Sequence, residues 1–294
     1  MDFALFSHVP WPEGADPKQV YDDIIEEFVL GEELGFKSAW TAEHHFTRYG
    51  LGSAPNVLAS HLVANTSKIR IGSAIFVSPL HLPARLAEEI ATLDILSGGR
   101  IEVGFGRGAA SSEYNVAGVP VEESQQRFQE SITMIEGLWT TKNYSFEGQH
   151  YKITDANLVP PPVQKPHPPI HIAATRTKAT QDFVAASGHP LLVGVVLDTE
   201  DAMGLCHTMV NLAKEKGQNM SMGQIPFFRY FYVAETEDQA KADSKPALDW
   251  NIDMIQWRRT FDTGSEVWEK MEDFRNSRTA VSYTHLTLPT SDLV

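Results

Sequence analysis

Short apolar runs alternate along the chain with longer segments in which apolar residues recur every three or four positions. The second pattern is clear where Val20, Ile24 and Phe28 precede Gly35, which is typical of an amphipathic helix closed by glycine. The runs that predict buried strands are residues 3–9, 37–40, 69–77, 100–105, 170–174, 191–197 and 225–234. The segments that predict helices are residues 20–34, 55–66, 83–96, 122–140, 177–187, 199–216 and the chain from 236 onward.

This alternation predicts a parallel sheet covered by helices, because parallel neighbours need crossover connections. Seven strand–helix units in a row favour a closing TIM (β/α)8-type barrel over an open doubly wound sheet. The first strand is not followed by a G-x-G-x-x-G turn, which argues against a dinucleotide-binding domain. Residues 144–159 interrupt the rhythm and predict a hairpin, followed by a proline-dense connector over 160–169.

Composition narrows the classes of partner. The 294 residues carry 24 Lys and Arg against 38 Asp and Glu, a net charge of −14, which excludes a generic binder of nucleic acid or anionic membrane. The single cysteine, Cys206, excludes an internal disulfide and a cysteine-based zinc site. We expect a soluble cytoplasmic protein, because the sequence shows neither a signal peptide nor an apolar stretch of about 18 residues.

The candidate chemistry gathers at the carboxyl ends of the predicted strands, where a barrel places its active site. Glu43, His44 and His45 follow the second strand. An imidazole exchanges protons near neutral pH and a neighbouring carboxylate fixes its tautomer, so the three are candidate catalytic residues. The alternative is that Glu43 and His44 only cap the next helix. A histidine after the third strand, His81, is more typical of loop packing or capping than of catalysis.

Two further strand ends carry groups suited to a phosphate. Arg107 lies between two glycines after the fourth strand, where a guanidinium and a close backbone suit an anion, although an exposed turn arginine would look the same. Arg176, Thr177 and Thr180 open the helix after the fifth strand, where free N–H groups attract an anion. Plain capping by Thr175 or Thr177 is the alternative there. Together the two sites suggest one phosphate-bearing cofactor.

At these residues the sequence resembles the bacterial luciferase-like flavin monooxygenase family, over residues 1 to about 275. The order and spacing of several short motifs carry the resemblance. The motifs are Ala42-Glu43-His44-His45-Phe46, Ile71-Gly72-Ser73-Ala74-Ile75, Leu93-Asp94-Ile95-Leu96-Ser97-Gly98-Gly99-Arg100, Gly104-Phe105-Gly106-Arg107-Gly108 and Ala173-Ala174-Thr175.

The resemblance implies a TIM barrel that binds reduced FMN, activates dioxygen as a flavin hydroperoxide and oxygenates a small organic substrate such as an aldehyde or alkane. By position it implies a non-proline cis peptide at Ala74–Ile75 under the flavin and a cofactor contact at Ala174. It further implies that His44, with His45 beside it, handles protons near the flavin. The residues implied to hold the phosphate are Arg107, Arg176, Thr177 and Thr180. The family commonly works as homodimers or heterodimers and takes its reduced flavin from a separate reductase.

The end of the sequence departs from this family. Residues 281–290 are Thr-rich and resemble translated adapter or vector sequence. We therefore expect a barrel domain over 1–280 that is truncated before strand 8, with an open seam between strands seven and one. Residues 281–294 are expected to form a non-native or disordered tail.

Three alternatives stay open. A hydride-transfer enzyme of the same superfamily would use the deazaflavin coenzyme F420, which also carries phosphate. A metal-dependent barrel hydrolase would use Glu43, His44, His45 and His171, although adjacent histidines on a strand point to opposite faces and rarely share one ion. A non-catalytic partner subunit would have no chemical need of the histidine pair. Four aromatic residues line an apolar pocket or belong to the barrel core: Trp11, Phe46, Phe76 and Phe105.

Overall fold

The structure, a computed structural model, describes residues 2–257 of the chain. The chain is divided into two compact units. The first unit comprises Met1–Ala109 and Glu113–Ala173, and the second comprises Ala110–Ser112 together with the chain from Ala174. The expected tail from residue 281 and the expected seam before strand 8 lie outside the described residues, so the division into a 1–280 domain and a tail stays a prediction.

The first unit is built on parallel strands in the order β1-β2-β3-β4-β7, with mixed α/β architecture. Its strands are β1 (Ala4–Ser7), β2 (Ser38–Thr41), β3 (Arg70–Val77), β4 (Ile101–Gly106) and β7 (Ile170–Ala173). Its main helices are α1 (Pro17–Glu33), α2 (Pro55–Asn65), α3 (Pro83–Ser97) and α5 (Ser124–Thr140). The sequence pattern predicted each of these elements, with ends displaced by a few residues. It missed the short helix α4 (Ser111–Ala117) and did not separate the 3-10 turns η1 (Ser78–Leu80) and η2 (Val121–Glu123).

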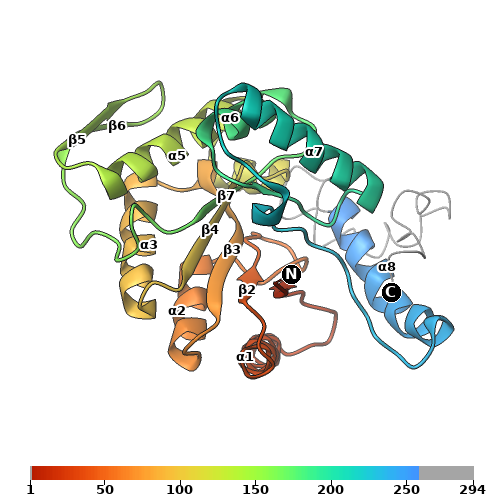
Figure 1. The fold of residues 1–294 in the computed structure, drawn as a ribbon. Coiled ribbons are helices and arrows are strands. Elements are labelled where there is room, and N and C mark those ends of the chain that lie inside the picture. Colours follow the sequence, from red (N-terminus) through yellow and green to blue (C-terminus); the bar gives the residue numbers. More distant parts are fainter. Residues whose placement is uncertain (1, 258–294) are drawn as a thin grey trace. The chain divides into compact units, whose positions relative to one another are not determined.

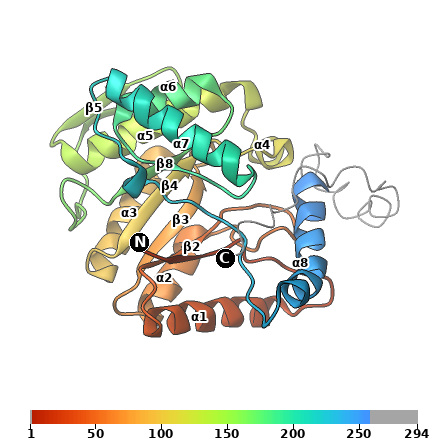
Figure 2. The same ribbon diagram turned by 45° about the vertical axis from the view of Figure 1, so that its right-hand side comes forward.

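Local chemistry sets where these helices begin and end. The Asp16 side chain caps α1 by accepting from the N–H of Lys18, and Pro17 occupies the first turn, where its missing N–H costs nothing. Helix α3 ends at Gly98, whose φ of 67° is the left-handed conformation that glycine adopts without a steric penalty. Figures 1 and 2 show α1, α2 and α3 alternating with the strands of the sheet. Their buried Phe28, Leu62 and Ile90 contribute to the apolar core.

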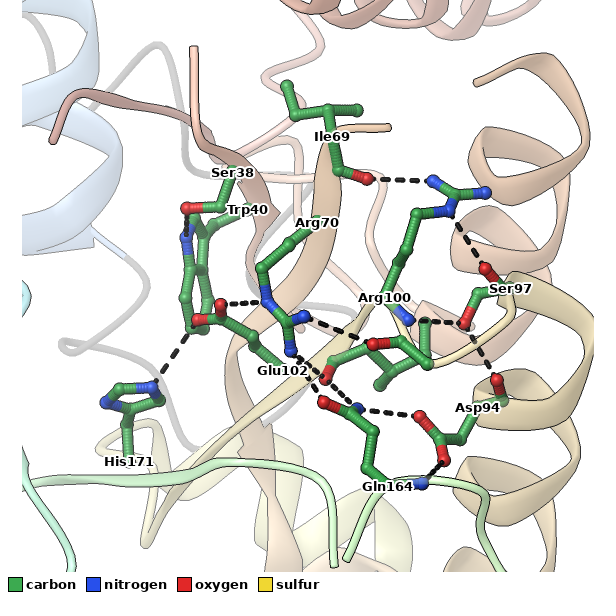
Figure 3. A network of polar contacts seen from close by, with 12 residues as sticks. Ser38, Trp40, Ile69, Arg70, Asp94, Ser97, Arg100, Glu102, Gln164 and His171 are labelled. Carbon is green, nitrogen blue, oxygen red and sulfur yellow. Dashed lines mark hydrogen bonds and ion pairs between the residues drawn. The ribbon is translucent and has the colours of Figure 1, made fainter. Parts of the chain in front are cut away.

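The amino ends of these strands hold a set of polar side chains that we call the base network: Arg70, Asp94, Arg100, Glu102, Gln164 and His171 (Figure 3). Arg70 Nε donates to Glu102 Oε1 at 2.5 Å, and its terminal nitrogens donate to the carbonyls of Gly99 and Ile101. Gln164 joins Arg70 to the fully buried Asp94. The other oxygen of Glu102 lies 3.5 Å from His171 Nε2.

The predicted hairpin is present as the antiparallel pair β5 (Tyr144–Glu147) and β6 (Lys152–Ala156). The tip between the two strands is held by one side chain of α5. The Glu130 carboxylate accepts the backbone N–H groups of Gln149, His150 and Tyr151 at 2.7 to 3.2 Å. Because Gly148 has no Cβ, the backbone passes within contact of this carboxylate; a Cβ there would lie 2.4 Å from Glu130 Oε2.

The second unit contains α6 (Lys178–Ser187), β8 (Leu191–Leu192), α7 (Thr199–Glu215), the 3-10 turn η3 (Met222–Gln224) and α8 (Glu237–Trp257). Two strand predictions were wrong here. Residues 191–197 form a strand only at Leu191–Leu192, and residues 225–234 form only the isolated bridge from Phe227 to Val193.

The physical reason lies in the missing partners. Pro226 has no N–H to donate to a neighbouring strand. Phe231 and Val233 are 78% and 72% exposed, so these apolar side chains lie on the surface and not in a sheet core. No helix between residues 2 and 257 combines the length and the apolar character needed to cross a membrane.

Candidate functional site

The loop after β2 presents the predicted Glu43, His44 and His45 at the carboxyl end of the strands. All four residues of β2 are buried, so the packing of the strand fixes the position at which the loop begins. Two glycines then let the following loop pack back on it. A Cβ at Gly52 would lie 1.9 Å from the Ala42 carbonyl oxygen, and one at Gly50 would lie 2.3 Å from the His8 carbonyl oxygen. This close packing holds the histidine pair in place.

Glu43 is the centre of this loop, with a side chain that is 0% exposed. Its Oε1 accepts from His45 Nε2 at 2.7 Å, and both its oxygens lie 2.9 Å from His81 Nε2. Its Oε2 also accepts the backbone N–H of Val77, at the end of β3, at 3.0 Å. The carboxylate therefore ties the loop after β2 to the segment after β3, which is more than the helix-capping alternative requires.

His44 turns to a second carboxylate. Its Nδ1 lies 3.6 Å from Glu113 Oε1, and the same oxygen accepts the backbone N–H of His45 at 3.1 Å. The His44 ring also contacts the rings of Tyr49 and His8, at centroid distances of 4.5 and 5.7 Å. The two adjacent histidines thus point to different carboxylates, as expected for neighbours on an extended chain. We call Glu43, His44, His45, His81 and Glu113 the rim cluster.

Contacts within the rim cluster shift the pKa values of Glu43 and His45. Burial works against ionisation of Glu43, but hydrogen bonds from His45 and His81 outweigh it and lower the pKa of this carboxyl to about 2. Burial also works against a charged His45, yet its bond to Glu43 and the field of Glu113 raise the His45 pKa above its usual range. Because Nε2 of His45 faces the carboxylate, Nε2 carries the hydrogen and Nδ1 is the atom that takes up or releases a proton.

The Ala74–Ile75 peptide bond in β3 is cis, as the resemblance implies. Between Ile71 and Val77 all residues of the strand are buried except Ala74 and Ile75, which keep part of their surface exposed. The strand lies close to its neighbour at this step, because a Cβ at Gly106 would lie 1.9 Å from Ile75 Cδ1. Ala74 and Ile75 are therefore accessible from outside the strand. They lie just before Val77, whose backbone N–H donates to the Glu43 carboxylate.

Arg107 follows β4 in the first unit and is half-buried. Its Nη1 donates to Ser124 Oγ at 3.3 Å, and its carbonyl oxygen accepts from the Tyr114 hydroxyl. Burial raises the pKa of Tyr114, so this phenol stays protonated and acts as a donor. Arg107 is thus better fixed than an exposed turn arginine, and its guanidinium stands beside a hydroxyl, which suits an anion.

The other predicted phosphate residues belong to the second unit. Arg176 and Thr177 are exposed, whereas Ala174 and Thr180 are buried. Thr177 precedes α6, but its side chain makes no capping hydrogen bond, and its carbonyl accepts the N–H groups of Thr180 and Gln181. The capping alternative is therefore not realised at Thr177. A phosphate held jointly by Arg107 and these residues stays a prediction.

The structure separates the residues of the metal-hydrolase alternative. His171 lies in the base network beside Glu102, and its ring packs on Trp40 (Figure 3). It is the second residue of β7, whereas Glu43 follows the carboxyl end of β2. Among residues 2–257, no group of three His, Cys, Asp or Glu side chains has the arrangement of a metal site. Phe76 and Phe105 are fully buried against each other as core, whereas Phe46 is 51% exposed.

Sequence reasoning missed two members of the rim cluster. Glu113 lies on the short helix α4, which the pattern did not reveal, and His81 was interpreted as loop packing. The only signal for both was their position after predicted strands, at the same end as Glu43.

Comparison with known proteins points to one family. A family model described as luciferase-like monooxygenase matches residues 1–292. The oxygenase component of a flavin-dependent trigonelline monooxygenase from Acinetobacter baylyi is 33% identical over 249 residues, which cover 82% of this chain and 67% of that protein. Across three curated relatives that it matches, the chain spans 54 to 67% of their length.

Solved structures support the same fold. The monooxygenase RslO1 from Streptomyces bottropensis matches with a TM-score of 0.83 at 24% identity, covering 94% of this chain and 89% of that one. The oxygenating constituent of 3,6-diketocamphane monooxygenase from Pseudomonas putida, solved with FMN, matches with 0.78 at 17% identity, covering 99% and 80%. An F420-dependent secondary alcohol dehydrogenase matches with 0.71 at 18% identity, covering 98% and 84%. The fold is therefore the luciferase-like, TIM-barrel type.

Proposed function

The chain belongs to the luciferase-like monooxygenase family, and on that premise we propose that it is the oxygenase of a flavin-dependent monooxygenase. It uses reduced FMN and dioxygen to oxygenate a small, apolar organic substrate such as an aldehyde or alkane, as an oxidoreductase acting on paired donors. The observation that carries the proposal is the rim cluster, where a buried carboxylate binds two imidazoles and the end of β3. Imidazoles placed in this way can hold and move a proton beside a bound cofactor.

The residues present fit a flavin. Ala74 and Ile75 are the partly exposed apolar residues of β3 beyond Arg70, and a flat apolar ring system can rest on them. Arg107 and Ser124 offer charged and neutral donors for a phosphate. Arg176, Thr177 and Thr180, at the amino end of α6, are proposed as phosphate residues from the family resemblance alone. Ala174 would complete the cofactor contacts by position. When bound, the flavin supplies the activation of dioxygen, while the protein orients the reactants and excludes water.

The proton chemistry falls to the rim cluster. Glu113 Oε1 lies 3.6 Å from His44 Nδ1, so we assign the proton exchange of His44 to its opposite ring nitrogen, Nε2. Glu43 holds His45 in the complementary way, by Nε2. The two imidazoles therefore offer different ring nitrogens to the reaction.

We further propose that reduced FMN comes from a separate reductase and that the oxygenase works as a homodimer or heterodimer. The relative from Acinetobacter baylyi is named an oxygenase component, which supports a divided system. An oligomer is supported by the exposed apolar side chains of α2 and α3, among them Val57 at 71% and Leu96 at 66%.

A second candidate is hydride transfer with coenzyme F420, which the similarity to the F420-dependent alcohol dehydrogenase favours. Both cofactors carry phosphate, so Arg107 does not discriminate between them. Titration of the protein with FMN and with F420 under the same conditions separates the two, because the tighter ligand identifies the cofactor.

The decisive experiment measures flavin affinity. We expect Arg107→Ala to weaken binding of reduced FMN by about 10- to 100-fold, since a charge-assisted phosphate contact contributes about 1.5 to 3 kcal/mol. Arg85→Ala is the matched control, because Arg85 on α3 is 68% exposed and pairs with Glu88 and Glu89 of the same helix. Anaerobic fluorescence titration gives both constants. Equal affinities for the two variants would overturn the phosphate assignment.

A further inference from the structure

One carboxylate in the rim cluster serves two imidazoles that come from different elements. His45 belongs to the loop after β2, whereas His81 follows η1 beyond β3. Both approach Glu43 by Nε2, at 2.7 and 2.9 Å from the same oxygen. The Glu43 side chain is 0% exposed, while those of His45 and His81 are 19% and 23% exposed. Water therefore does not screen the carboxylate itself, but it reaches both rings to exchange protons.

This sharing couples the two rings. Glu43 brings one negative charge, which can fully neutralise one imidazolium but not two. The charge that favours the protonated form of His45 is therefore shared with a second ring that approaches the same oxygen. The two histidines compete for one carboxylate.

We propose that His81 is a positioning residue that shares the Glu43 carboxylate with His45 and thereby sets the pH at which His45 exchanges its proton. The inference rests on the proposed function, in which His45 handles protons beside the flavin. His81 itself acts through Glu43, so it need not touch the flavin or the substrate. It also makes a ring contact with the buried Phe76, at a centroid distance of 6.1 Å, which keeps the imidazole turned to the carboxylate.

Other charged groups around His45 also influence its protonation. Glu113 faces His45 from α4, where its Oε1 accepts the His45 N–H and lies near His44 Nδ1. Glu43 faces it from its own loop, and His81 from the segment after η1. Glu113 therefore favours the charged form of His45 whatever His81 does, and the effect of His81 appears as a change on top of it.

The test follows the proton of His45 directly. Protein labelled with ¹³C at the histidine ring carbons is titrated by NMR between pH 5 and 9 without flavin, and the His45 resonance is identified by its loss in His45→Asn. In His81→Asn the amide can still donate to Glu43 but carries no charge. We expect the His45 midpoint to rise by about one pH unit in this variant. In Glu43→Gln, which removes the shared charge, we expect it to fall.

His61→Asn is the matched control, because His61 is exposed on α2, where its carbonyl accepts from Asn65 in the same helix. Its substitution is expected to leave the His45 midpoint unchanged. Far-ultraviolet circular dichroism checks that each variant is folded. A His45 midpoint in His81→Asn that equals or lies below that of the unchanged protein would overturn the proposal.

A second readout separates this inference from the proposed function. With reduced FMN and an oxidisable aldehyde, the pH profile of turnover should move in His81→Asn in the same direction as the His45 midpoint. A moved midpoint with an unmoved profile would overturn the role of His81 in the reaction. Loss of flavin binding by the unchanged protein would instead overturn the proposed function and leave the NMR result interpretable.

Discussion

The rim cluster and the base network lie at opposite ends of the same parallel strands, and both are organised around buried or half-buried carboxylates. At the base, Glu102 faces the guanidinium of Arg70, a permanently charged type of group, with the imidazole of His171 3.5 Å from its other oxygen. At the rim, Glu43 faces imidazoles, which change charge near neutral pH. The two acids thus differ in their partners: Glu102 has a permanent cation beside one imidazole, whereas Glu43 has two imidazoles.

The largest expected effect is on the stability of the base. Arg70→Ala removes the guanidinium partner of Glu102 and the side-chain donor to the Gly99 carbonyl. It also removes one of the two side-chain donors to the Ile101 carbonyl, the other being Gln164. We expect the free energy of unfolding to fall by about 3 kcal/mol in urea titration. The exposed Arg85→Ala on α3 should cost less than about 0.5 kcal/mol. If both variants lose the same stability, the base network is not a structural element.

A second comparison uses two glycines, one near each end. In Gly72→Ala the new Cβ would lie 2.2 Å from the indole of Trp40, a rigid ring of the core, and we expect a loss of about 2 kcal/mol. In Gly106→Ala it would meet the terminal Cδ1 of Ile75, which can rotate away, so we expect less than about 1 kcal/mol. Thermal unfolding measures both. The reverse order would show that the rim is the more rigid end.

The smallest expected effect is a dependence of stability on pH, which we expect at the rim cluster more than at the base network. The His45 pKa is raised in the folded protein, so its pair with Glu43 stabilises fully below the unfolded value of about 6.5 and is lost as pH rises through the folded value. We therefore expect His45→Asn to lower the unfolding free energy more at pH 5.5 than at pH 8.5, by about 1 kcal/mol. The loss in Arg70→Ala should differ less between the two values, because a guanidinium is a permanent cation. Equal losses in His45→Asn would contradict the raised pKa.

The sequence predicted the elements that are defined by local periodicity. Helices α1 to α3 and strands β1 to β4 repeat apolar residues at spacings that one short window contains, and their ends are fixed by local signals such as Pro17 and Gly98. Residues 225–234 show the limit of this approach, because an apolar run becomes a strand only where a partner strand accepts its hydrogen bonds.

The site was predicted to a similar degree. Glu43, His44 and His45 are adjacent in sequence, so their motif was visible. The contacts that give them chemistry are not local: Glu43 and His81 are 38 residues apart, and His45 and Glu113 are 68 apart. Only the fold brings these pairs together. A pattern of strand ends predicts that such residues meet, but not which of them share a proton.

The anchoring of the hairpin tip by Glu130 has a practical consequence. Because one α5 carboxylate collects three backbone N–H groups at the turn, the turn keeps its shape whatever side chains the outer faces of β5 and β6 carry. Those faces, with Glu147 and Lys152 paired in solvent, are thus a natural place to attach a fluorophore or an affinity handle. Provided that Glu130 and Gly148 are kept, a group attached there should leave the fold of the hairpin and the parallel sheet unchanged.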